Sequence, residues 1–290
     1  VLGVTGSIAA YKIANLTSML TKLHADVHVL MTQNATNFIN PITFETLTNH
    51  KCLVDTFDRN FNYNIEHVSL GNKADLVLVA PASANIIAKM ANGIADDMLS
   101  TTLLACRCKK LVAPAMNTNM YLNPIVQDNM KRLQNYGFEM VEAASGHLAC
   151  GDSGIGKLPE EKLLVEHIVR SIAREKDMKG MKVLVSAGAT MEAIDPVRYI
   201  TNHSTGKMGF ALAKAAMLRG ASVTVVKGHT EAEEPHFVKM VPVKSAQQMF
   251  EAVKEEAADA DIVIMAAAVA DYRPSEVYDQ KVKKSDGEMS

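Results

Sequence analysis

Cys150 lies in a run of glycine and polar residues, 145–157 (SGHLACGDSGIGK), whose composition is not that of a packed core. The four glycines of this run predict a mobile backbone that can fold over a ligand. A cysteine at the centre of such a segment could supply a thiol proton or a thiolate. We interpret the run as a substrate-covering lid that carries a catalytic acid, with an exposed loop and an incidental cysteine as the alternative.

Two turns of small polar residues follow apolar, strand-like runs. Gly6 and Ser7 stand between such a run and a helical pattern, where free backbone N–H groups and the helix dipole favour an anion such as phosphate. A tight turn without a ligand is an equal alternative for this motif alone. Ser83 and Asn85 repeat the arrangement after residues 75–80 and could hydrogen-bond a cofactor ring or a phosphate. The two turns together indicate a mononucleotide cofactor.

Two further side chains could move a proton or hold a carboxylate. His67 precedes a short apolar run, and its imidazole could take or give a proton near neutral pH. Taken alone, it fits a core or surface histidine better. Asn117 follows a strand-like run and a proline, so its amide could bind a carboxylate. Its alternative role is to cap the helix that begins after it.

Strand-like and helical patterns alternate along the chain, which predicts α/β architecture with parallel sheets and helices on both faces. A charged run at residues 174–180 interrupts the alternation and suggests a domain boundary, giving domains 1–176 and 177–290. Ligands in such folds gather at the carboxyl ends of the strands, where the polar motifs lie. The predicted strands are residues 1–4, 26–31, 75–80, 110–115, 181–186, 222–227 and 261–266, with helices near 159–176, 207–219 and 245–258.

Composition sets the class of protein. With 290 residues, 48% hydrophobic and 21% charged, the chain is long enough for two globular domains. A net charge of −2 gives no reason to expect nucleic acid, and no apolar stretch is long enough for a membrane span, so we expect a cytoplasmic protein. Four cysteines without a regular spacing predict neither a disulfide framework nor a zinc site. The chain starts within a strand-like run and stops in a polar tract, so we expect an excerpt of a longer protein whose second domain is truncated.

The motifs of the first domain closely resemble the phosphopantothenoylcysteine decarboxylase family of flavin-dependent cysteine decarboxylases. They are residues 6–12 (GSIAAYK), the His67 segment, 114–120 (PAMNTNM) and the Cys150 run, and the resemblance covers residues 1 to about 175. It implies a Rossmann- or flavodoxin-like domain that binds FMN, in a homo-oligomer whose trimer interfaces build the flavin site. It also implies that His67 is a base or proton relay, Asn117 binds the substrate carboxylate and Cys150 protonates the enethiol intermediate.

The chemistry also fits a flavin. Loss of carbon dioxide from a cysteine needs an electron sink at the thiol-bearing carbon, which no side chain supplies, whereas oxidation by FMN to a thioaldehyde places the carboxylate β to a C=S group. Two rival functions remain. One is decarboxylation of a peptide's C-terminal cysteine, and the other is a flavin-binding regulatory subunit without catalysis.

The second domain has motifs of its own. Residues 195–209 (DPVRYITNHSTGKMG) open a helix at a phosphate-compatible terminus, and residues 266–274 (AAAVADYRP) follow the last strand. The lysines of 281–284 are by themselves typical of a solvated surface, but beside these turns they suggest a clamp for a triphosphate.

These motifs resemble phosphopantothenate–cysteine ligase, which in bacteria is commonly fused behind the decarboxylase. The resemblance implies a bifunctional enzyme of coenzyme A biosynthesis that joins 4′-phosphopantothenate to cysteine with CTP and Mg²⁺. It implies that Asn202 contacts the acyl-cytidylate and that Lys281 stabilises the leaving phosphates. Asp271 and the backbone of Met265, Ala266 and Ala267 would hold the nucleotide, whereas no metal-ligating side chain is indicated.

Overall fold

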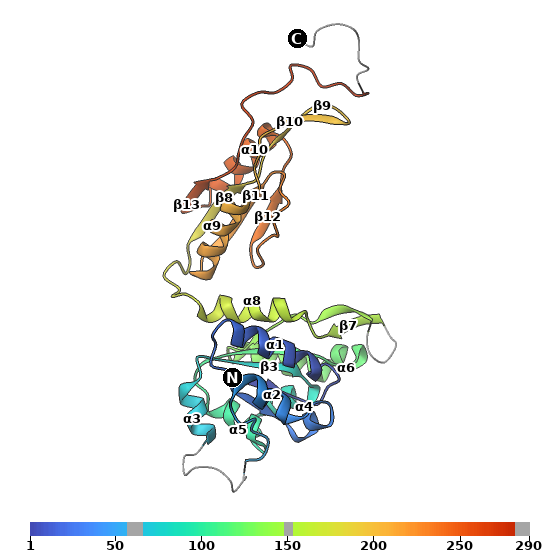
Figure 1. The fold of residues 1–290 in the computed structure, drawn as a ribbon, viewed down its shortest axis with the longest axis vertical. Coiled ribbons are helices and arrows are strands. Elements are labelled where there is room, and N and C mark those ends of the chain that lie inside the picture. Colours follow the sequence, from blue (N-terminus) through green and yellow to red (C-terminus); the bar gives the residue numbers. More distant parts are fainter. Residues whose placement is uncertain (57–65, 148–152, 282–290) are drawn as a thin grey trace. The chain divides into compact units, whose positions relative to one another are not determined.

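The computed structural model describes residues 1–56, 66–147 and 153–281 (Figure 1). The chain divides into two compact units, Val1–Ile172 and Ala173–Ser290. The described part of the chain contains no helix with the length and apolar character that a membrane crossing requires.

The first unit is built on a five-stranded parallel sheet with the strand order β2-β1-β3-β4-β5. The central strand β3 is buried along its whole length, as expected for a parallel sheet covered on both faces. The strands are β1 (Leu2–Val4), β2 (Val29–Met31), β3 (Leu76–Ala82), β4 (Lys109–Pro114) and β5 (Glu139–Met140).

Helices cover both faces of this sheet because its strand residues alternate between two apolar clusters. Leu78 and Ala80 pack with α1, α2 and α8, whereas Val77 and Val79 pack with α3, α4, α5 and α7. The helices are α1 (Ala10–Lys22), η1 (Gln33–Asn37), α2 (Pro41–Thr48), α3 (Glu66–Lys73), α4 (Ala84–Asn92), α5 (Met98–Ala105), α6 (Thr118–Leu122), α7 (Pro124–Asn135) and α8 (Glu161–Ile172).

An ion-pair cluster joins α8 to the edge of the sheet. Glu139 on β5 accepts hydrogen bonds from Arg170 and from His167, at 3.1 Å for the imidazole, and lies 2.6 Å from the Lys109 ammonium. Burial alone would raise the pKa of Glu139, but the hydrogen bonds from His167 and Lys109 and the charge of Arg170 outweigh it and lower this pKa to about 2. The carboxylate therefore holds α8 against β4 and β5.

A short antiparallel pair, β6 (Ala144–His147) and β7 (Ser153–Lys157), flanks residues 148–152. The sequence predicted a mobile loop over the whole of 145–157, and for the flanks this prediction is wrong. Gly156 on β7 is required for close approach to the backbone of Met116.

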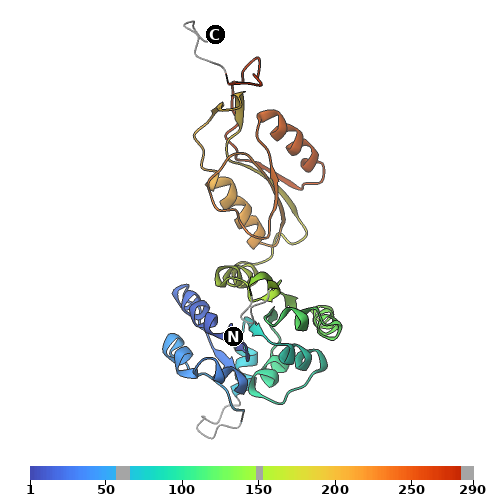
Figure 2. The same cartoon turned by 90° about the vertical axis from the view of Figure 1, so that its right-hand side faces the viewer.

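The second unit contains a four-stranded parallel sheet with the order β12-β11-β8-β13. Helices α9 and α10 lie on opposite faces of it, which Figure 2 shows in two shades of orange. A hairpin of β9 and β10 extends from the loop after β8. The elements are β8 (Lys182–Ala187), β9 (Met191–Asp195), β10 (Arg198–Thr201), α9 (Lys207–Leu218), β11 (Ser222–Lys227), β12 (Lys239–Pro242), α10 (Ala246–Ala257) and β13 (Ile262–Met265).

Both units are α/β folds with parallel sheets, as the alternation of patterns predicted. All seven predicted strands are present, although β2 begins at Val29 rather than at residue 26. The sequence missed β5, β12 and the two hairpins.

Candidate active site

The strand order of the first unit sets the place of its ligand site. The chain leaves β1 toward β2 on one side and returns to β3 on the other, so the connections diverge at the carboxyl ends of β1 and β3. Open parallel sheets bind ligands at such a switch point. The predicted cofactor residues Gly6 and Ser7 follow β1, and Ser83 and Asn85 lie at the end of β3 and in the first turn of α4, so all four lie at this edge.

A buried hydroxyl joins the two turns. Thr5 is fully buried, and its Oγ1 donates to the Pro81 carbonyl at 2.6 Å while accepting from the Ser83 N–H at 3.0 Å. The Ser83 side chain in turn caps α4 by accepting from the Ile86 N–H at 3.4 Å. Thr5 therefore sets the spacing between the two predicted phosphate-compatible turns.

Three features at this edge fit a bound phosphate. A Cβ on Gly6 would lie 2.9 Å from the Asn34 Cβ, so the turn after β1 is packed against the turn after β2. Thr32, which follows β2, has a buried hydroxyl without a hydrogen-bond partner among the described residues. A buried hydroxyl of this kind usually has a ligand, ion or water as its partner. Helices α1 and α4 also begin here without an acidic residue in the first turn. The residues present fit the phosphate of a flavin mononucleotide.

Asn117 lies in the loop after β4, beside the end of β3, since the Ala115 N–H donates to the Ala82 carbonyl at 3.1 Å. Its side chain caps α6 by accepting from the Asn119 N–H at 2.9 Å. The capping role weighed from the sequence is therefore present, and the amide lies at the same edge as the predicted cofactor residues.

The β6–β7 hairpin packs on this Asn117 loop. The Met116 N–H donates to the Gly156 carbonyl at 3.0 Å, and the Thr118 hydroxyl donates to the Ile155 carbonyl at 2.9 Å. A Cβ on Gly156 would lie 2.3 Å from the Met116 carbonyl oxygen, so no other residue fits there without displacement. Close packing, rather than mobility, explains the glycine at 156.

Cys150 lies outside the described residues, between the two strands of this hairpin. His67 lies in the first turn of α3, and the structure describes its backbone only. Burial raises the pKa of Cys52 to about 12 and that of Cys106 to about 11, so these two thiols are unsuited to acid or nucleophilic chemistry at neutral pH.

The second unit repeats the switch-point arrangement between β8 and β13. The fully buried Ser186 Oγ accepts from the N–H groups of Ala266 and Ala267, at 3.1 and 3.2 Å. The Asn202 amide donates to the Val269 carbonyl at 3.0 Å, so the structure brings Asn202 to the segment that follows Met265.

The remaining predicted ligase residues are less closely placed. Asp271 and Lys281 lie on exposed coil after β13, and within the described residues no hydrogen bond or ion pair joins either to Asn202. Because Ser186 occupies the amides of Ala266 and Ala267, a nucleotide would have to use other atoms of this segment or displace the hydroxyl.

A large cavity among the described residues of the second unit lies elsewhere. It has a volume of about 1030 Å³ and is lined by the β9–β10 hairpin and the ends of β11 and β12, including Arg198, Lys227 and His229. None of the predicted ligase site residues lines it, but Asp195 and Arg198 of the first ligase-like motif and Arg273 of the second do. We give the switch point more weight as a nucleotide site, because the predicted nucleotide-binding residues lie there and two of the cations that line the cavity pair locally, Arg198 with Asp195 and Lys227 with Glu234.

Comparisons with known proteins assign the family. The flavoprotein family model matches residues 1–173, and the model of the DNA/pantothenate metabolism flavoprotein C-terminal domain matches residues 178–290. The chain is 46% identical over 292 residues to the coenzyme A biosynthesis bifunctional protein CoaBC of Bacillus subtilis, covering 100% of this chain and 72% of the relative. The chain belongs to this family. The protein of the same name from Haemophilus influenzae is 42% identical, with the same coverage of 100% and 72%.

Solved structures match the first unit. A mutant PPC decarboxylase complexed with pantothenoylaminoethenethiol has a TM-score of 0.53 and 29% identity, covering 58% of this chain and 93% of that one. The FMN-binding protein AtHal3 has a TM-score of 0.51 and 30% identity, covering 58% and 92%. The family resemblance drawn from the motifs and the flavodoxin-like parallel-sheet fold are thereby confirmed.

Sequence reasoning missed the hydroxyls of Thr5, Thr32 and Ser186 as site residues. Each stands at or just after the carboxyl end of a strand, and that position was the available signal. Whether such a hydroxyl is buried, and what it bonds, depends on the neighbouring strand and is not visible in a local pattern.

Proposed function

We propose that the first domain, residues 1–176, is an FMN-dependent decarboxylase of 4′-phosphopantothenoylcysteine. Residues 177–290 then belong to a phosphopantothenate–cysteine ligase that uses CTP and Mg²⁺, and both reactions serve coenzyme A biosynthesis. The CoaBC relatives that match the full chain and the PPC decarboxylase that matches its first unit support this proposal.

One observation carries the decarboxylase assignment: the β6–β7 hairpin packs on the Asn117 loop at the switch-point edge. The Met116 N–H donates to the Gly156 carbonyl, so the hairpin whose two strands flank residues 148–152 in the sequence is attached to the Asn117 loop. A substrate whose cysteine carboxylate is bound by the Asn117 amide would then lie beside this hairpin and near the mononucleotide turns.

Each residue of this domain has a role in the proposed reaction. Gly6, Ser7, Ser83 and Asn85 bind the cofactor, which when bound supplies the electron sink that no side chain can. Asn117 orients the carboxylate that leaves as carbon dioxide, and the low polarity of a covered site favours that loss.

Proton transfer completes the reaction. His67 takes or relays a proton at the substrate thiol, and Cys150 returns one to the enethiol carbon. Because the proton returned by Cys150 is needed only after carbon dioxide has left, the two residues act at different steps.

In the second domain, Asn202 is proposed to contact the acyl-cytidylate and Lys281 the leaving phosphates. Asp271 and the segment Met265–Ala267 are proposed to hold the nucleotide. The position of the β8 and β13 carboxyl ends beside Asn202 supports this assignment. We propose further that the protein acts in the cytoplasm as a homo-oligomer built from trimers.

The test is a purified chain given synthetic 4′-phosphopantothenoylcysteine and, in parallel, a peptide ending in cysteine. We expect carbon dioxide from the first substrate and little from the second, and we expect heat to release FMN rather than FAD in a ratio near one per chain. A chain that binds no flavin would overturn the decarboxylase proposal, and preference for the peptide would overturn its substrate.

A further inference from the structure

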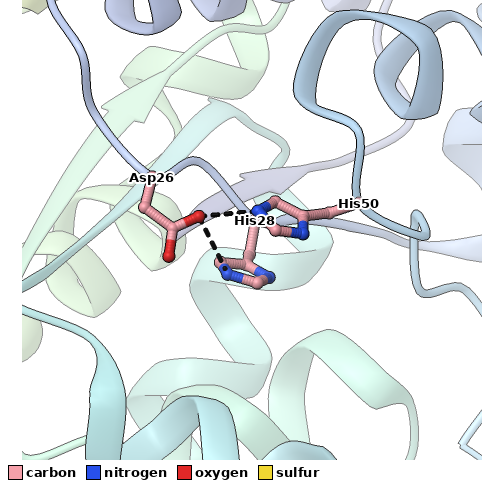
Figure 3. Close-up of side chains that lie close together, drawn as sticks. All are labelled: Asp26, His28 and His50. Atoms are coloured by element: carbon pink, nitrogen blue, oxygen red, sulfur yellow. Dashed lines mark hydrogen bonds and ion pairs between the residues drawn. The ribbon is translucent and has the colours of Figure 1, made fainter.

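A second cluster of titratable side chains lies at the amino-terminal edge of the first unit's sheet, opposite the edge described above. Asp26 and His28 lie just before β2, and His50 lies in the loop after α2. The segment that follows His50 runs alongside β2, since the Leu53 N–H donates to the Val29 carbonyl at 3.1 Å. This pairing brings His50 beside His28, and Figure 3 shows both rings next to the Asp26 carboxylate. We refer to Asp26, His28 and His50 as the histidine cluster.

The ligand atoms of the histidine cluster are close together. Asp26 Oδ1 lies 2.6 Å from His50 Nε2 and 3.4 Å from His28 Nε2, and one such atom from each residue lies within 4.8 Å of the others. Imidazole nitrogen and carboxylate oxygen bind Zn²⁺ at roughly 2.0–2.2 Å, which separates two ligand atoms of a tetrahedral site by about 3.4 Å. Small side-chain movements would therefore bring all three atoms into a common coordination shell.

One atom of the cluster has no hydrogen-bond partner. His28 Nε2 is buried and unbonded among the described residues, and its distance to Asp26 Oδ1 exceeds that of a good hydrogen bond. An imidazole with an unused ring nitrogen can bind a metal ion through that nitrogen.

A cavity adjoins the histidine cluster. It has a volume of about 310 Å³ and is lined by Asp26, His28 and Lys73, among others, but not by His50. The two imidazole rings are stacked, with centroids 4.1 Å apart and planes 16° apart, and Figure 3 shows them side by side. Because the lone pair of an imidazole nitrogen lies in the ring plane, one ring must rotate to share an ion with the other. The more exposed His50, on a loop, is the ring that can do so.

Lys73 is the competitor of such an ion. Its ammonium lies 2.7 Å from Asp26 Oδ2 and its side chain is mostly exposed, so it can move away from the carboxylate at small cost. A cation already paired with Asp26 weakens binding of a second one, and removing it should strengthen that binding.

We propose that Asp26, His28 and His50 form a binding site for a divalent transition-metal ion, with two imidazoles and one carboxylate as protein ligands. Zn²⁺ is the probe of choice because this ligand set suits it, and water would complete its coordination. The bound ion would link the segment before β2 to the loop after α2, on the side of the sheet away from the proposed cofactor site.

The experiment measures zinc binding to the purified full chain by calorimetry and by metal analysis after gel filtration. We expect the unchanged protein to bind one zinc ion. His50→Ala and Asp26→Asn should each lower the affinity for zinc at least about 100-fold, whereas Lys73→Met should raise it about tenfold. His236→Ala, which removes an exposed imidazole in the second unit, is the matched control and should bind as the unchanged protein does.

Folding is checked separately so that each outcome counts. Circular dichroism and the thermal midpoint without zinc show whether a variant is folded, and His50→Gln replaces His50→Ala if the latter is not. Zinc should raise the thermal midpoint of the unchanged protein but not of the His50 variant. Absence of zinc binding, equal binding by the folded His50 and Asp26 variants, or weaker binding by Lys73→Met would overturn the proposal and leave an ion-pair cluster only.

Discussion

Gly156→Ala should impair decarboxylation far more than it impairs folding. Gly156 has a φ of +127°, where a side chain is strained by about 1–3 kcal/mol. The new Cβ would also lie 2.3 Å from the Met116 carbonyl oxygen, against at least 3.4 Å for an ordinary contact, so the hairpin must move by about 1 Å. That movement stretches the hydrogen bond from the Met116 N–H to the Gly156 carbonyl, which contributes about 1 kcal/mol to the free energy of unfolding.

Gly137→Ala is the matched control. Gly137 also has a positive φ, of +88°, but nothing lies within 4 Å of the position that its Cβ would take. Both variants should therefore lose about 1–3 kcal/mol through backbone strain, and Gly156→Ala about 1 kcal/mol more. Only Gly156→Ala displaces the segment that carries Cys150.

A displacement of about 1 Å in a catalytic group can cost about 100-fold in rate. We therefore expect Gly156→Ala to release carbon dioxide from 4′-phosphopantothenoylcysteine about 100-fold more slowly, at unchanged flavin content, while Gly137→Ala keeps a nearly normal rate. Circular dichroism melts and flavin absorbance show whether both proteins are folded. A folded Gly156→Ala protein within about threefold of Gly137→Ala would refute the positioning argument.

Three other expectations concern acid stability, the order of proton transfers and the division of labour. Glu139 has a pKa of about 2 instead of 4.5, so the ionised carboxylate stabilises the fold fully above about pH 4.5 and loses this effect as the pH falls toward 2. Because Glu139 is partly exposed, we expect it to contribute about 1–2 kcal/mol to the free energy of unfolding. Urea unfolding of Glu139→Gln should lack that pH dependence. Cys150→Ala should take up substrate, release carbon dioxide once and then stop, whereas His67→Asn should block the oxidative step that precedes loss of carbon dioxide. Anaerobic stopped-flow absorbance distinguishes these two outcomes. Normal turnover by Cys150→Ala would contradict the proposed role of Cys150. Asn202→Asp and Lys281→Gln should abolish or stall ligation in the full-length protein but leave decarboxylation intact, as carbon dioxide release would report.

The sequence predicted seven of the nine strands of the two parallel sheets, because each of the seven contains a short apolar run next to a polar turn. It missed β9 because that strand carries buried charged residues, one of which has its partner far along the chain. Glu192 is buried and accepts from the Ala246 N–H at 2.8 Å, and Asp195 is buried and pairs with Arg198. Such buried acids look like a loop in a local pattern, and only the folded neighbourhood explains them.

The candidate site was predictable to a similar extent. Strand-end positions identified Gly6, Ser83 and Asn117, because parallel strands bring their carboxyl ends to one edge. The packing of β7 on the Asn117 loop was not predictable, since the glycine-rich composition that suggested mobility is equally what close backbone contact requires. Composition alone does not separate these two uses of glycine, whereas the Cβ position at Gly156 does.

The two units use the same device at their switch points. In the first, a buried threonine hydroxyl after β1 hydrogen-bonds the backbone at the end of β3; in the second, the buried Ser186 hydroxyl at the end of β8 hydrogen-bonds the backbone that follows β13. Loss of either hydroxyl would leave backbone groups that are mostly only partly buried without their partner, at up to about 1–3 kcal/mol each. Each bond holds the spacing of two strand-end loops within its own unit, so Thr5→Val should disturb only the first site and Ser186→Ala only the second. The spacing of each site is thus controlled locally, which is the condition under which the two proposed reactions can be separated by single substitutions.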